Sequence, residues 1–162
     1  MDGVQIRLKL MLNTLGIPSD ISSLENRILI QKAIFIAQEA GSNLGYSYSW
    51  YVHGPYSPEL TKDYYILNND LACGDKDFNK YTLVPTLTEN IDKIKHIFTV
   101  PKGVGLSQEK WLELVASIIY WKKATNNDET TKNILKAQKK ELLDYYPNAM
   151  SIIKKTTIFS QQ

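Results

Sequence analysis

The sequence predicts a mostly helical α+β fold with a winged-helix-like core, a small β-ribbon and additional helices toward the C-terminus. Three observations predict it: long segments with apolar residues at helical spacing, one short alternation of aromatic and serine residues, and a last third without strand signals. We expect residues 1–100 to form the core and residues 101–162 to pack on it as a helical extension. A chain of 162 residues is long enough to bury such a core without disulfides.

The first two segments predict helices. Residues 4–15 carry apolar side chains on one face, and Gly16 ends the pattern. Residues 24–40 follow a capping-box pattern formed by Ser22 and Glu25. This second helix is apolar nearly all round, which predicts burial on most of its sides.

The segment after the second helix predicts a strand, a corner and a third helix. Residues 46–52 alternate aromatic residues with serines, as a strand does. Gly54 permits the backbone angles of a sharp corner, and Pro55 makes it rigid. Ser57 and Pro58 supply an N-cap hydroxyl and a proline at the first helical position. A stripe toward the core follows, formed by Leu60, Tyr64, Leu67 and Leu71.

The remaining elements are predicted from turn and capping residues. Residues 72–84 predict a hairpin with Gly74 near its turn, and Thr88 opens a further helix. Ser107 caps an apolar helix. Asp128 caps a lysine-rich helix that we expect Pro147 to stop. For residues 148–162 a strand, a short docking segment and no fixed structure remain alternatives.

The residues that carry chemistry are sparse. Cys73 and two histidines, His53 and His96, lack any paired ligand spacing, so we expect no metal and no cofactor. Phosphate-binding loops, nucleophile elbows and zinc-protease motifs are absent, and His53 has no evident nucleophile to activate. A non-enzyme is therefore expected. No apolar run is long enough to span a membrane and no secretion signal is evident, which favours the cytoplasm.

Charge separates the two halves of the chain. Residues 1–87 hold seven Lys/Arg and nine Asp/Glu, a balance of −2, whereas residues 88–162 hold twelve and eight, a balance of +4. A polyanion should therefore prefer the C-terminal half. The candidate nucleic-acid contacts share one predicted helix face and are Lys132, Lys136, Lys139 and Lys140. A solvated face of an amphipathic helix is the favoured alternative.

A candidate protein-binding surface lies between the corner and the third helix. Tyr51, Tyr56 and Tyr65 fall within fifteen residues, and Tyr65 lies off the apolar stripe with Lys62 nearby. Tyrosines anchor interfaces because they bury a large area at little rotamer cost. The alternative is burial in the core, which we expect of Trp50, Val52, Tyr51 and Tyr56.

Three segments together resemble a known pair of families. They are LIQKAIFIAQEAG (29–41), YVHGPYSPEL (51–60) and YTLVPTLTEN (81–90). They resemble the YwgA-like group and the Panacea group, the antitoxin domain typified by the antitoxin SocA, both found in small bacterial and phage proteins. The match covers about residues 4–100 and falls on Gln31-Lys32, His53-Gly54-Pro55-Tyr56 and Leu87-Thr88.

The resemblance implies a winged-helix fold and a non-enzymatic regulatory module of one of two kinds. One kind binds a protein, as an antitoxin does or as part of a phage-defence or counter-defence system. The other is a DNA-binding winged-helix transcriptional regulator. The helix after Pro58 exposes Glu59 and Asp63, which would repel DNA phosphates, so a protein partner is preferred. The oligomeric state stays open.

Overall fold

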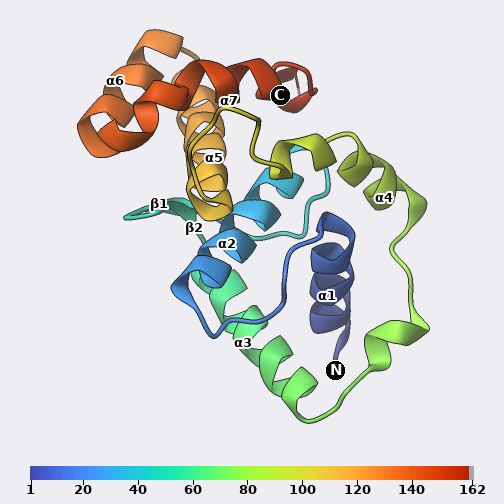
Figure 1. Cartoon of the computed structure of the whole chain (residues 1–162). Coiled ribbons are helices and arrows are strands. Elements are labelled where there is room, and N and C mark those ends of the chain that lie inside the picture. The colour runs from blue at the N-terminus through green and yellow to red at the C-terminus, as the bar shows by residue number, and fades with distance from the viewer. Residues whose placement is uncertain (161–162) are drawn as a thin grey trace.

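The computed structural model describes residues 1–160 and has a mostly helical α+β fold (Figure 1). In chain order it contains α1 (Gly3–Leu15), α2 (Leu24–Glu39), β1 (Ser49–Tyr51), β2 (Gly54–Tyr56), α3 (Pro58–Ala72), α4 (Pro85–Asp92), α5 (Gln108–Thr125), α6 (Asp128–Gln138) and α7 (Tyr146–Ile153). Short 3-10 turns are η1 (Asp77–Lys80), η2 (Lys95–Phe98), η3 (Lys140–Tyr145) and η4 (Ile158–Ser160).

The centre of the molecule is the contact between α2 and α5. Both helices were expected to be apolar, and α2 is buried from Ile28 to Ala37 while α5 is buried from Trp111 to Ile119. α1 packs on α2 and α3, while α6 and α7 cover the other side of α5 (Figure 1). Two helices that need cover on every side therefore supply it to each other, and the shorter helices complete the core.

The β-ribbon is a short hairpin between α2 and α3. β1 and β2 pair antiparallel, with Trp50 opposite Pro55 and Tyr51 opposite Gly54. A two-residue turn, Val52-His53, joins them. The strand predicted at residues 46–52 is thus confirmed for its second half, and the chain continues directly from β2 into α3.

The hairpin predicted at residues 72–84 is wrong. This stretch forms the η1 turn and no strand in the structure, because its Asp and Lys residues do not alternate with apolar ones. The carboxylate of Asp75 instead binds the amino group of Met1 and accepts from the Asp77 backbone. No ribbon follows α3 within residues 1–160, so nothing occupies the place of the expected wing.

Several element boundaries also differ from the sequence expectations. The N-cap of α2 is Ser23, whose hydroxyl accepts from the Asn26 backbone, and not Ser22. α4 begins at Pro85, ahead of Thr88.

The last third differs more. α6 ends at Gln138, well before Pro147, which lies in the first turn of α7. The tail forms α7 and η4 up to Ser160. Of the three alternatives for residues 148–162, the strand is wrong for the described residues, while residues 161–162 lie outside them.

Candidate functional site

Gln31 on α2 fixes the corner through the backbone of Ser57. Its side-chain oxygen accepts from the Ser57 N–H at 2.9 Å, and its side-chain nitrogen donates to the Ser57 carbonyl at 3.0 Å. The same nitrogen donates to the Thr61 hydroxyl at 2.9 Å. Ser57 in turn caps α3 as predicted, with its Oγ accepting from the Leu60 N–H and Pro58 next to it. The side-chain amide of Gln31 therefore forms with the backbone of Ser57 the pair of hydrogen bonds that a residue of a neighbouring strand would form.

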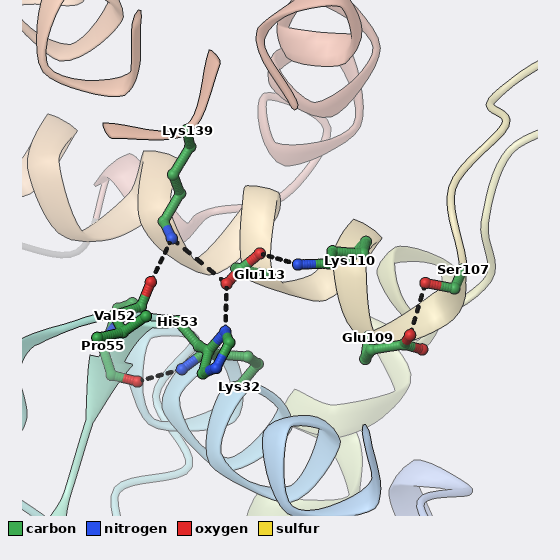
Figure 2. Close-up of polar contacts among 9 residues, drawn as sticks. All are labelled: Lys32, Val52, His53, Pro55, Ser107, Glu109, Lys110, Glu113 and Lys139. Carbon is green, nitrogen blue, oxygen red and sulfur yellow. Dashed lines mark hydrogen bonds and ion pairs between the residues drawn. The ribbon is translucent and has the colours of Figure 1, made fainter. Parts of the chain in front are cut away.

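Lys32, the next residue on α2, holds the other side of the corner. Its side chain is buried, with 1% of the residue exposed, and Nζ donates to the Pro55 carbonyl at 2.6 Å (Figure 2). Burial lowers the pKa of Lys32 to about 7 because the ammonium loses its water, and the nearby charge of Lys139 lowers it further. The carboxylate of Glu113 acts in the opposite direction.

Glu113 on α5 is the centre of a buried charge cluster. Its Oε1 lies 3.3 Å from Lys139 Nζ and 3.3 Å from His53 Nδ1, and its Oε2 lies 3.5 Å from Lys110 Nζ (Figure 2). Because a carboxylate only accepts, His53 holds its proton on Nδ1 toward Glu113. The carboxylate of Glu113 thus faces Lys110 and Lys139, and its charge also acts to raise the pKa of Lys32.

Lys139 joins the C-terminal third to the hairpin. It follows α6, yet its side chain is buried and donates to the Val52 carbonyl at 2.9 Å. Its Nζ also lies 5.3 Å from the centre of the Trp50 ring, within the range of a cation–π contact. The turn between β1 and β2 is therefore held from α2 on one side and from the end of α6 on the other.

A hollow of about 370 Å³ opens between α2, the hairpin turn and the start of α3. Of the eight large hydrophobic residues exposed in the described chain, half line it: Leu24, Tyr51, Val52 and Tyr65. Its further lining includes Tyr56, Tyr64, Arg27 and His53, with Lys32 and Gln31 behind them. We call this feature the tyrosine hollow.

The structure brings together the three tyrosines expected at an interface. Tyr51, Tyr56 and Tyr65 all line the tyrosine hollow, and the rings of Tyr51 and Tyr56 contact each other with centres 5.0 Å apart. Lys62 is exposed on α3 but does not line the hollow. Ser57 and Pro58 take the cap positions expected of them at the start of α3. Gly54 has the positive φ that was expected, but Gly54 and Pro55 lie in β2 and not in a turn.

Core burial was a wrong expectation for two hairpin residues. Tyr51 is 50% exposed and Val52 is 84% exposed, because the strands end there and the turn projects beyond the helices. Trp50 does pack partly on the core, and Tyr56 is half-buried.

The lysine face expected of the C-terminal helix is also wrong. α6 ends at Gln138, so Lys139 and Lys140 leave its surface, and Lys139 is turned inward to Glu113. Lys132 and Lys136 remain exposed on α6, with Lys132 above the ring of Tyr146. A continuous row of four phosphate contacts is therefore not formed.

Sequence reasoning missed Glu113, Lys139 and Arg27 as parts of this site. Glu113 had a usable signal, since it is the lone carboxylate in the apolar stretch WLELVASIIYW, and a lone charge on a buried helix requires a buried partner. Lys139 had no such signal in the sequence, because its partners Glu113 and Val52 lie 26 and 87 positions away.

Two features are absent from residues 1–160. This part of the chain holds no group of three or more His, Cys, Asp and Glu side chains placed to bind a metal ion. Its helices are all too short or too polar to cross a membrane. Comparison with protein-family models, with curated proteins and with solved structures finds no match to the chain.

Proposed function

We propose that the chain is a non-enzymatic regulatory or adaptor module that binds a protein partner in the tyrosine hollow. The gathering of half of its exposed large hydrophobic residues around one hollow is the observation that carries this proposal. Exposed apolar side chains scattered singly are normal, but their gathering on one surface is typical of an interaction site. The resemblance to the Panacea and YwgA-like groups extends the proposal to an antitoxin-like role or one in phage defence or counter-defence.

The rigidity of the surface supports binding by a preformed site. Gln31, Lys32 and Lys139 fix the backbone of the corner and of the turn from opposite sides. A partner that meets an already ordered surface loses less entropy of ordering, so more of the contact energy appears as affinity. Tyr51 and Tyr65 are the exposed aromatic anchors on this base.

A DNA-binding regulator is the weaker alternative. α3 exposes Glu59 near its start, and the basic row on the C-terminal helix is broken by the burial of Lys139. Three or four aligned phosphate contacts would give a slope of about −3 when the logarithm of the DNA-binding constant is plotted against the logarithm of the salt concentration. The lysines of the C-terminal third are not aligned in this way.

Tyr65→Ala tests the proposal against a matched control, Tyr81→Ala. The two tyrosines are 52% and 56% exposed, but Tyr81 lies on a different surface and does not line the tyrosine hollow. A photo-crosslinking amino acid placed at position 65, and in a parallel strain at position 81, identifies the partner in cells that express the chain. Affinity is then measured by calorimetry with the purified partner and each alanine variant.

We expect Tyr65→Ala to weaken the complex by roughly 1–3 kcal/mol. The melting temperature should change little, because Tyr65 is half exposed and its ring contact within the chain is with Tyr64 at the edge of the core. Tyr81→Ala should leave both quantities unchanged. A partner that crosslinks only from position 81, or that binds Tyr65→Ala as tightly as the original chain, would contradict the proposal. Unfolding of Tyr65→Ala would mean that its ring stabilises α3 instead.

A further inference from the structure

Building on this proposed function, we infer that the tyrosine hollow binds an acidic segment of the partner. Such a segment places an aliphatic or aromatic side chain between Tyr51 and Tyr65, and an adjacent Asp or Glu meets the basic residues of the hollow. Two observations carry this: the basic residues of the lining, to which Lys32 belongs, and the further lysines Lys110 and Lys139 behind it.

The lining is basic without any compensating acid. Among its described residues are Arg27, Lys32 and His53, and none is Asp or Glu. The guanidinium of Arg27 is half-buried and donates through Nη1 to the Ile21 carbonyl at 2.7 Å, which leaves further N–H groups for a ligand. The ring of His53 directs its Nδ1–H to Glu113, so its Nε2 can only accept and His53 offers an acidic ligand no hydrogen bond.

The side chains behind the lining of the hollow also carry more positive than negative charge. Lys32, Lys110 and Lys139 are gathered around the single carboxylate of Glu113. Without counting His53, Lys110 and Lys139 against Glu113 leave a balance of +1, and Lys32, whose pKa is about 7, adds about half a charge at pH 7. Lys32 and Lys139 are buried, so their charges are screened less than surface charges, and an anion in the hollow is attracted through the wall as well as at the rim.

The apolar character of the hollow decides between a protein and a nucleic acid. Leu24, Val52 and Tyr65 would contact a phosphate backbone without any favourable interaction, whereas a Leu, Ile or Phe side chain fits them. Nucleic-acid sites instead place several cations along a track, and here a single arginine lies at the rim. A ligand with a carboxylate beside an apolar side chain matches both the basic and the apolar residues of the tyrosine hollow.

The experiment selects peptides and then removes each charge in turn. A random seven-residue peptide display library is selected on the immobilised full chain, after depletion on Tyr65→Ala. The most enriched peptide is synthesised in its original form and with each Asp or Glu replaced by Asn or Gln. Binding is measured by fluorescence anisotropy to the original chain, to Arg27→Gln and to a matched control, Arg7→Gln. The chain has only these two arginines, and each donates to one loop carbonyl.

We expect selected peptides to be enriched in Asp or Glu next to Leu, Ile or Phe. Arg27→Gln should weaken the original peptide about tenfold, the amide peptide should lose a similar factor on the unchanged protein, and Arg7→Gln should have no effect. Arg27→Gln should not weaken the amide peptide further, because the interaction is already removed. If Arg27→Gln is less stable than the original chain, the comparison of the original and the amide peptide on the unchanged protein still tests the inference.

The remaining outcomes separate the two proposals. Neutral or basic peptides that bind the original chain but not Tyr65→Ala would overturn the acidic partner while leaving the tyrosine hollow as a protein-binding site. The same holds for acidic peptides that bind Arg27→Gln and the original chain equally and tolerate the amide change. Failure to enrich any peptide that depends on Tyr65 would overturn the binding site itself, and with it this inference.

Discussion

Gly54 is the residue on which the corner depends most directly. Its φ is +94°, and a Cβ added there would lie 2.9 Å from the Ser117 hydroxyl on α5. Ser117 is fully buried, so it has little room to move. The position therefore combines an unfavourable backbone conformation for other residues with a steric wall.

We expect Gly54→Ala to lower the free energy of unfolding by about 1 kcal/mol from backbone strain alone, and by more once Ser117 is displaced. Gly45→Ala is the matched control, because Gly45 has a φ of +88° and open space around its Cα. Urea denaturation of both variants separates the strain from the steric conflict. Equal losses would show that Ser117 yields, and a Gly54→Ala variant as stable as the original chain would remove the structural role of the corner.

At the scale of elements, α2 holds the chain before and after the hairpin with two glutamines. Gln31 pairs with both backbone groups of Ser57, and Gln38, seven residues later, pairs in the same way with both backbone groups of Tyr46. The strands are only three residues each, so these side-chain pairs replace the ladder that a longer sheet would supply.

Gln31→Met and Gln38→Met test the role of the two glutamines, because Gln31 bonds a buried backbone and Gln38 bonds a half-buried one. Ser57 is fully buried, so Gln31→Met leaves its N–H without a partner or water, while its carbonyl keeps the Thr61 backbone N–H. The variant should therefore destabilise by about 1–3 kcal/mol. Tyr46 is half-buried, so water can replace Gln38 and the loss should be about 1 kcal/mol or less. Thermal melting of the two variants measures the difference, and the reverse order would contradict the argument.

The sequence predicted helices better than it predicted where the ribbon lies. Helix prediction worked because a cap such as Ser57 and a stripe such as Leu60 to Leu71 are local signals. The ribbon depended on distant contacts. The three-residue β2 has too little alternation to be recognised, and the glycine at position 74 suggested a hairpin where Asp75 instead binds the amino group of Met1.

The same distinction separates the predicted and missed parts of the site. Tyr51, Tyr56 and Tyr65 were found because aromatic residues near a turn are visible in the sequence. Their convergence with Leu24 and Arg27 required knowledge of how α2 and α3 cross. The burial of Lys139 was hidden because the lysine-rich pattern continues past the true end of α6.

At the scale of the whole molecule, Lys139 is the residue that ties the C-terminal third to the hairpin turn, beside a hydrogen bond from the Trp50 indole to Gln138. It bonds the Val52 carbonyl and Glu113, whereas its neighbour Lys140 is exposed. We expect Lys139→Met to speed amide hydrogen exchange in the peptide that contains residues 50–53, because the turn loses its hold on α6. Lys140→Met is the matched control and should leave the exchange unchanged. Equal exchange in both variants would mean that α2 and the hydrogen bond from the Trp50 indole to Gln138 are enough to order the turn.

The whole molecule also carries the energetic consequence of burying Lys32. The pKa of Lys32 is about 7 in the folded chain, against an ordinary value of 10.5 that the unfolded chain should show. Between these two values the unfolded state binds a proton that the folded state lacks, so the free energy of unfolding rises with pH. Below about pH 7 both states carry the proton and this rise ends.

The measurement compares the original chain with Lys32→Met by urea denaturation at pH 7 and pH 9. Over these two units the original chain should gain about 2 kcal/mol relative to the variant, since each pKa unit corresponds to about 1.4 kcal/mol and the folded lysine is only half titrated at pH 7. Lys32→Met leaves the Pro55 carbonyl without its donor, so its stability falls at both pH values. That loss cancels in the comparison. If the two proteins change in parallel between pH 7 and pH 9, Lys32 stays charged in the folded chain, and Glu113 rather than desolvation decides its protonation.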